Sequence, residues 1–217
     1  MIKTLGRAAL LAAVIGMPVS AHAVTQDLNS FATNTAINSL GFGGGITATV
    51  TTVSNRSGGT NQAVTFDSDN PTGNDDDLGP FTPGQGQILI IAGPENGSQG
   101  LPDDDSQGGT ITFDFNQAVN LLSFVYIDTE SPNNELLLSA SNGFSIGNGS
   151  GLVTGNFARD TFNAGGALDN ITSISFIFEG SGAIDDFNVT AVPLPLPGVL
   201  LGGVLLAGYG LSRRRKA

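Results

Sequence analysis

The chain has 217 residues, with 19 acidic and 8 basic side chains, a net charge of −11 at pH 7 and no cysteine. The lack of cysteine excludes disulfides, thiol nucleophiles and cysteine-bound metals. The one histidine is His22, and no lysine occurs from Val24 to Val192. The body of the chain therefore lacks the side chains for Ser-His-Asp catalysis, histidine-bound zinc or lysine Schiff bases. Its acidic charge also disfavours nucleic acid, because the phosphates would be repelled.

The first 23 residues have the pattern of a secretory signal peptide. Lys3 and Arg7 form a basic start, residues 8–17 are apolar, and Ala21-His22-Ala23 is a small-x-small cleavage site. We expect cleavage after Ala23, so that the mature protein starts near Val24. The chain then divides into a signal peptide (1–23), an extracellular domain (24–191) and a C-terminal signal (192–217).

The body has only two basic residues, Arg56 and Arg159, and contains all of the acidic ones. It is long enough to form one domain with a substantial core. This charge balance favours solubility and the binding of divalent cations.

Strand-like runs recur along the body and are separated by Gly, Asn, Asp and Pro. The expected strands are 46–53, 62–66, 87–92, 110–115, 119–128, 135–140, 173–178 and 183–191. No stretch shows a sustained helical period of apolar residues. Residues 26–40 fit either a short helix or a loose strand, and the pattern does not choose between them.

This spacing predicts an all-β fold, an antiparallel β-sandwich of jelly-roll type. In 110–115, alternation places Ile111, Phe113 and Phe115 on one face. The expected core is rich in phenylalanine, and its candidates are Phe66, Phe113, Phe115, Phe124, Phe176, Phe178 and Phe187.

Two loops are dense in aspartate, at residues 67–77 and 103–105. Carboxylates crowded on loops are suitable ligands for Ca²⁺. The spacing does not fit an EF-hand, because Thr72 and Leu78 stand where that loop needs Gly and Glu. A solvated acidic loop that keeps the protein soluble is the alternative. The calcium candidates are Asp67, Asp69, Asp75, Asp77 and Asp185.

Asp185 belongs to an Asp pair inside the expected last strand, where aspartate is a poor strand former. The segment Gly182–Val189 resembles the closing strand of calcium-bearing jelly-roll modules, including many carbohydrate-binding modules. That resemblance implies that Asp185 joins an early acidic residue, here Asp67, around a structural ion. Strict alternation puts Asp185 on the core side with Phe187. The alternative is that Asp185 binds nearby amides without a metal.

The C-terminus combines a proline motif, an apolar span and a basic tail. The motif is Val192-Pro193-Leu194-Pro195, residues 198–211 carry no charge, and Arg213, Arg214, Arg215 and Lys216 follow. The prolines favour an extended stalk. The span is short for a permanent membrane helix, which needs about 20 residues. The basic tail predicts that this end faces the cytoplasm.

These three parts in this order resemble the PEP-CTERM sorting signals, and the opening is closest to the VPLPA-CTERM variant. Leu194 stands where the name-giving signal has Glu, and Leu196 replaces the alanine that usually follows VPLP. The resemblance implies processing or anchoring by an exosortase-type membrane enzyme in an exopolysaccharide-producing bacterium. An ordinary C-terminal anchor helix is the alternative.

Together these features predict an exported, non-catalytic protein of the extracellular matrix or biofilm that is secreted or anchored at the cell surface. Its expected partners are Ca²⁺, extracellular polysaccharide and the membrane. One alternative is a secreted carbohydrate-active enzyme that uses paired carboxylates, with Glu95, Glu130, Glu135 and Glu179 in its inventory. Another is a purely structural adhesin or coat protein that binds its own kind.

Overall fold

Strands make up almost all of the regular structure in the computed structural model, which describes residues 22–72, 76–79, 83–93, 101–130, 135–147 and 149–192. The strands are β1 (Val24–Gln26), β2 (Ser39–Gly41), β3 (Thr47–Ser54), β4 (Ala63–Asp67), β5 (Gln87–Ile91), β6 (Gly109–Ile127), β7 (Leu136–Ala140), β8 (Ser145–Ile146), β9 (Arg159–Asn163), β10 (Ile171–Phe178) and β11 (Ala183–Ala191). In this part of the chain the only helical element is the 3₁₀ turn η1 (Asp76–Leu78). The predicted all-β, antiparallel class is confirmed.

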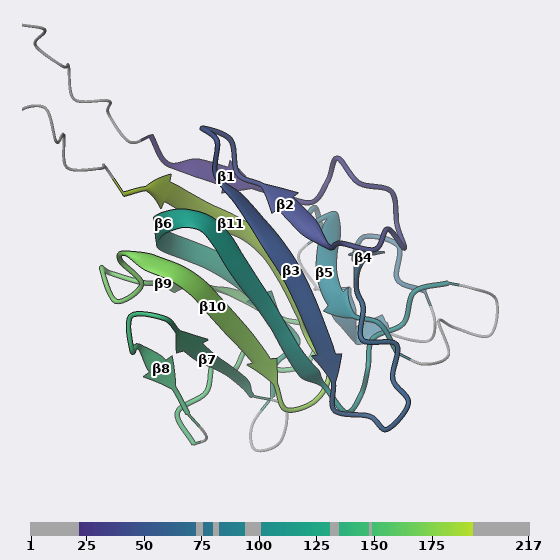
Figure 1. The fold of residues 1–217 in the computed structure, drawn as a ribbon. Coiled ribbons are helices and arrows are strands. Elements are labelled where there is room, and N and C mark those ends of the chain that lie inside the picture. The colour runs from purple at the N-terminus through teal and green to yellow at the C-terminus, as the bar shows by residue number, and fades with distance from the viewer. Residues whose placement is uncertain are drawn as a thin grey trace, which may run out of the picture. The chain divides into compact units, whose positions relative to one another are not determined.

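The long strand β6 organises the sheet. Its first half pairs with β3 on one side and β10 on the other, and its second half pairs with β11 and β9. One run of strands is therefore β2-β3-β6-β10-β7-β8, and the other is β4-β5-β11-β6-β9, with β1 beside β11. In Figure 1, β6 bends over on itself and its halves run in different layers, so the antiparallel sheet curls around a core.

The sequence pattern predicts separate strands at residues 110–115 and 119–128, whereas the structure joins them in β6. No glycine or proline interrupts the segment between them. The Asn116 side chain accepts a hydrogen bond from the Thr47 amide (3.0 Å) and donates one to the Gly45 carbonyl (2.9 Å). These bonds accommodate a polar residue within a continuous strand.

The main core lies inside the curl and is built on aromatic rings. Phe176 lies centrally, with ring centroids 5.4 Å from Phe113, 4.9 Å from Phe124 and 5.9 Å from Phe187. All seven predicted core phenylalanines are buried, and the structure adds Phe42. Alternation in β6 is confirmed, because Ile111 and Phe113 are buried while Asp114 is exposed.

A second, smaller apolar cluster covers the other face of part of the sheet. It contains Val64, Phe66, Leu78, Ile88, Ile90, Ala92, Val125, Ile127 and Ala183. Leu78 comes from η1, so the chain between β4 and β5 folds over this outer face. The sheet is consequently buried on both faces at β4 and β5, which explains why their strands are almost continuously apolar.

Residues 26–40, for which the sequence leaves two alternatives, contain no helix. β1 pairs with β11, and the following residues run beside β4 before β2 begins. The Asn34 amide donates to the Thr65 carbonyl (2.8 Å) and the Ile37 amide to that of Ala63 (2.9 Å). These bonds satisfy part of the edge of β4, which explains an extended conformation without a regular strand.

Candidate functional site

A β-bulge in β11 decides where the Asp pair points. Asp186 has a positive φ of 51°, and the register with β6 shifts between Asp185 and Asn188. Asp185 lies opposite Val125 of the second cluster, whereas Phe187 belongs to the main core. The predicted placement of Asp185 on the same face as Phe187 is therefore wrong, because the extra residue of the bulge interrupts strict alternation.

Asp185 is nevertheless fully buried, with an exposed fraction of 0%. Its Oδ2 accepts a hydrogen bond from Gln85 Nε2 (2.7 Å), and the same amide nitrogen donates to Asp186 Oδ2 (3.0 Å). Asp185 Oδ1 has no hydrogen-bond partner among the described residues. Burial raises the pKa of Asp185 to about 7, although the bond from Gln85 acts in the opposite direction.

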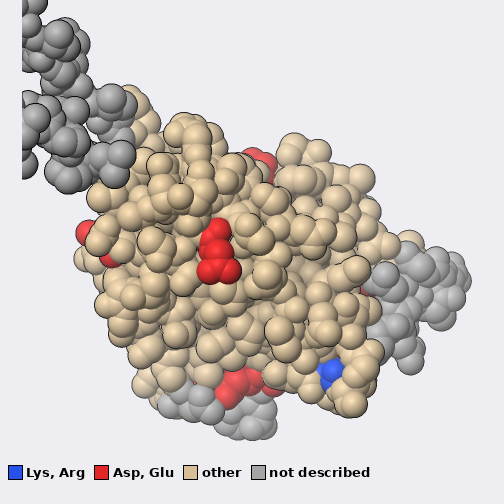
Figure 2. Space-filling view, in the orientation of Figure 1, with Lys and Arg blue, Asp and Glu red and all other residues tan. Residues whose placement is uncertain are grey.

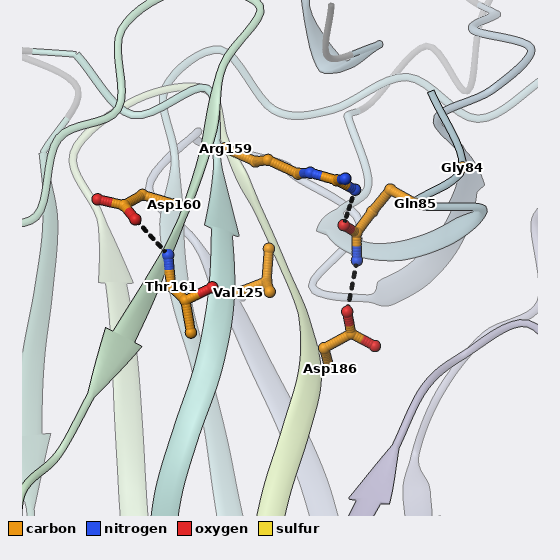
Figure 3. Close-up of a pocket in the computed structure, with 7 residues that line it drawn as sticks. All are labelled: Gly84, Gln85, Val125, Arg159, Asp160, Thr161 and Asp186. Atoms are coloured by element: carbon orange, nitrogen blue, oxygen red, sulfur yellow. Dashed lines mark hydrogen bonds between the residues drawn. The ribbon is translucent and has the colours of Figure 1, made fainter. Parts of the chain in front are cut away.

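Arg159 completes this group from β9. Its Nη1 donates to Gln85 Oε1, so the Gln85 amide connects a guanidinium to two carboxylates. Figure 3 shows Arg159 extending toward Gln85, with Asp186 below and Val125 between Thr161 and Asp186. The pocket has a volume of about 420 Å³ and lies where the Gly84–Gln85 segment crosses the outer face of β6, β9 and β11.

A second buried group contains two carboxylates that share one hydroxyl. Ser181 Oγ lies 2.6 Å from Asp104 Oδ2 and 3.2 Å from Asp128 Oδ2. The Gly182 amide donates to Asp104 Oδ2 (2.9 Å), and the Phe157 amide donates to Asp128 Oδ1 (3.3 Å). These residues come from the segment before β6, the end of β6 and the turn between β10 and β11.

Burial raises the pKa of Asp104 to about 6 and that of Asp128 to about 7. Negative charge adds to the effect, since Asp77 acts on both groups, Asp103 on Asp104 and Glu130 on Asp128. Ser181 has one hydroxyl hydrogen and can donate it to only one of the two carboxylates at a time. A proton or a cation at this group would reduce the repulsion between the two carboxylates.

The structure separates the predicted calcium ligands. Asp67 Oδ1 accepts from the Asp69 amide (3.1 Å) and its Oδ2 from Asn70 Nδ2 (3.0 Å), while Asp69 Oδ1 accepts from the Gly84 amide (2.6 Å). Asp67 follows Phe66 of the second cluster and so faces away from Asp185. The expected pairing of Asp67 with Asp185 is therefore absent.

The other loop aspartates do not share one site. Asp77 lies close enough to Asp104 and Asp128 to raise the pKa of both. Asp105 forms an ion pair with Arg56 at 3.0 Å, and Asp75 lies outside the described residues. The described residues hold no ready-made group of three or more metal-binding side chains. Figure 2 likewise shows acidic side chains in separate patches on the face in view.

Most residues of the expected sorting and export signals lie outside the described residues. These are Ala21 of the cleavage site, and Pro193, Leu194, Pro195, Arg213, Arg214 and Arg215 of the C-terminal signal. Ala23 is exposed and directly precedes β1. The Val192 amide donates to the Ala118 carbonyl (3.2 Å) just after β11. Within the described ranges, no helix has the length and apolar character needed to cross a membrane.

Sequence reasoning missed Gln85, Arg159 and Ser181. A lone glutamine or serine in a loop gives no chemical signal, and their partners are 53 to 101 positions away along the chain. The Asp pair at residues 185–186 was the one visible sign, because charge inside an apolar strand needs an explanation.

No protein-family model matches the chain, and no curated protein matches its sequence. The described fold defines an all-β protein with a curled antiparallel sheet. Its function has to be inferred from the buried polar groups and from the two ends of the chain.

Proposed function

We propose that this is an exported protein that an exosortase-type enzyme processes or anchors at the cell surface through the C-terminal signal. The positions of the outermost strands support this proposal. β1 starts at Val24, directly after the expected cleavage site, and β11 ends at Ala191, directly before the proline motif. Removal of either end would therefore leave all described strands intact.

Sequencing of the N-terminus of the secreted or surface protein tests the export step. We expect it to start at Val24. An Ala23→Arg variant should keep its leader, because signal peptidase needs a small residue there, whereas Ala32→Arg, an exposed position beyond the leader, should be processed normally. A surface protein that retains Met1 would contradict the proposal.

Within this proposal the domain is a jelly-roll-like sandwich without catalytic activity. The sharing of β6 between two runs of strands supports the sandwich form. The structural role of Glu135 supports the proposed lack of catalytic activity. Glu135 is buried, and its Oε2 accepts hydrogen bonds from the Gly149 and Gly151 amides, both at 3.1 Å. Incubation with polysaccharides followed by an assay for new reducing ends tests for hydrolysis.

We further propose that the domain binds Ca²⁺ beside the Asp104 and Asp128 pair, with Asp77 close enough for its charge to act on both. The observation that carries this proposal is the single Ser181 hydroxyl between two buried carboxylates. Ca²⁺ is bound by several carboxylate oxygens at once, and its charge would offset the repulsion between the two aspartates. Asp185 is the weaker candidate, because the Gln85 amide already donates a hydrogen bond to its Oδ2 atom.

Thermal unfolding with and without Ca²⁺ tests this site. At a concentration 100 times the dissociation constant, Ca²⁺ should stabilise the native state by about 2.7 kcal/mol, or several degrees in melting temperature. Asp128→Asn should abolish most of the shift. Asp169→Asn, the same change at an exposed position, should leave it intact. An equal shift in both variants, or none in the native protein, would contradict the site.

We propose extracellular polysaccharide as the macromolecular partner. The pocket beside Gln85 supports this choice, since its lining is mostly polar and includes Arg159, Thr161 and Asp186. Such groups donate to and accept from sugar hydroxyls. Binding of the full-length protein to a panel of glycans, with and without Ca²⁺, tests the partner class against self-association.

A further inference from the structure

Arg159 stands out because it has no carboxylate partner among the described residues of a very acidic protein. Among the described residues the only ion pair joins Arg56 and Asp105, so Arg159 has no carboxylate within 4 Å. Among the described residues, the Arg159 side chain forms one hydrogen bond, which it donates to Gln85 Oε1. A guanidinium has five N–H donors, and several of them remain available to a ligand.

The pocket holds this guanidinium in place. Gln85 is buried, with an exposed fraction of 4%, and the bonds to Asp185 and Asp186 fix its amide. The Gln85 carbonyl oxygen is thereby directed at Arg159. An arginine fixed in this way loses little freedom when it binds, which favours affinity.

The other walls determine which ligands fit. In β9, Arg159 and Thr161 lie opposite Ile127 and Val125, so both face the outer surface, whereas Asp160 lies opposite Tyr126, which belongs to the main core. Figure 3 shows the Asp160 carboxylate turned away from Arg159, toward the Thr161 amide. The pocket lining therefore contains one cation, the carboxylates of Asp160 and Asp186, and the Thr161 hydroxyl around the apolar Val125.

These groups suit a ligand with one negative charge and several hydroxyls. A carboxylate can form two parallel hydrogen bonds with a guanidinium. Hydroxyl groups can donate to Asp186 and exchange hydrogen bonds with Thr161. A phosphate dianion fits less well, because the single guanidinium lies close to the Asp185–Asp186 pair. The volume of about 420 Å³ falls within the range of about 300–1,000 Å³ found for small-ligand pockets.

We propose that this pocket binds a uronic-acid unit of an acidic polysaccharide, with the sugar carboxylate on Arg159 and its hydroxyls on Asp186 and Thr161. This inference deepens the proposed function and rests on its polysaccharide partner. It is independent of the Ca²⁺ group at Asp104 and Asp128, since no residue is shared between the two.

Calorimetric titration of the full-length protein tests the inference, with a trimer of galacturonate compared with a neutral glucose trimer and with inorganic phosphate. We expect the galacturonate trimer to bind at least 10-fold more tightly than either. Arg159→Gln should weaken its binding at least 10-fold, and Arg159→Lys should weaken it less. Arg56→Gln, the matched loss of an arginine outside the pocket, should keep full binding.

Thr161→Trp fills the pocket from an exposed position and should abolish binding even if Arg159→Gln unfolds the protein. Equal binding of the neutral trimer or of phosphate would overturn the inference, and so would no binding of the galacturonate trimer at millimolar concentration. If glycan binding persists in both Arg159→Gln and Thr161→Trp, this pocket is not the binding site, but polysaccharide is still the partner. The mature N-terminus and the Ca²⁺ response of the same preparations test the rest of the proposed function separately.

Discussion

Ser181 Oγ lies 2.6 Å from Asp104 Oδ2, although the two residues are 77 positions apart in the sequence. Ser181 lies between β10 and β11, Asp104 precedes β6, and Asp128, the other neighbour of this hydroxyl, follows β6. One hydroxyl thus connects the ends of several strands through carboxylates whose pKa values are raised. The stability of the fold should depend on the protonation of this group.

We predict that, without Ca²⁺, the native protein becomes less stable as the pH rises from about 4 to about 8. The folded pKa values are about 6 for Asp104 and about 7 for Asp128 and Asp185, against the ordinary aspartate value of 3.8. The folded state therefore holds protons that the unfolded state has released, so stability is full below pH 3.8 and falls as the pH passes through 6 and 7. Each pKa unit corresponds to about 1.4 kcal/mol, so even a fraction of these shifts should cost a measurable part of the stability at pH 8.

Urea unfolding in EDTA at several pH values measures this effect. Asp128→Asn should flatten the pH profile, because it removes one of the groups that gains a proton in the native state. Addition of Ca²⁺ should recover stability mainly at high pH, where the carboxylates are ionised. A native protein that is most stable at pH 8 in EDTA would contradict the prediction.

Asp185→Asn should raise the stability at pH 8 by about 1–2 kcal/mol and have little effect at pH 4. Asparagine keeps an oxygen that can accept from Gln85 Nε2 but carries no charge to bury. Chemical denaturation at the two pH values measures the difference. If the variant changes the stability equally at pH 4 and pH 8, then packing, and not charge, determines the free-energy cost of burying Asp185.

The strands and the core could be predicted because both follow from alternation of apolar side chains. Ile111, Phe113 and Phe115 alternate with polar residues, and the structure buries all three. Strands with weaker patterns were missed. β9 contains one large apolar residue, Phe162, in the sequence from Arg159 to Asn163, and its pairing with β6 comes from the curl of the sheet.

The candidate site could be predicted only in part. An Asp pair in an apolar strand indicated that Asp185 matters, but its face depends on Asp186 adopting a positive φ of 51°. Local sequence gives little sign of such a bulge, because any residue of the strand could be the extra one. Gln85 and Ser181 acquire their roles only through tertiary contacts.

Phe176→Ala should destabilise the protein by about 3–5 kcal/mol, the usual cost of removing a buried ring. Phe176 is fully buried and contacts the rings of Phe113, Phe124 and Phe187. Phe176→Leu, which leaves a smaller cavity, should cost clearly less. Denaturant unfolding measures both, and a loss below 1 kcal/mol for the alanine variant would mean that the core does not depend on this ring.

Glu135→Gln should cost about 1–2 kcal/mol. The Glu135 Oε2 atom accepts two backbone hydrogen bonds, from Gly149 and Gly151, and hydrogen bonds to a charged group are stronger than neutral ones. Glu179→Gln is the matched control, because that side chain is only partly buried, and its effect should stay within about 0.5 kcal/mol. Equal effects of the two changes would show that the loop at residues 149–151 does not depend on the Glu135 carboxylate.

Replacement of Arg213, Arg214 and Arg215 by glutamine should reduce surface display of the protein by about 10-fold or more. Basic residues beside an apolar span keep that end in the cytoplasm, and the proposed sorting signal needs this orientation. Replacement of the same three residues by lysine preserves the charge and should preserve display. Protease accessibility on intact cells measures the surface fraction, and melting of the purified variants should show an unchanged domain, because β11 ends at Ala191. Normal display of the glutamine variant would show that this tail does not direct the protein to the surface.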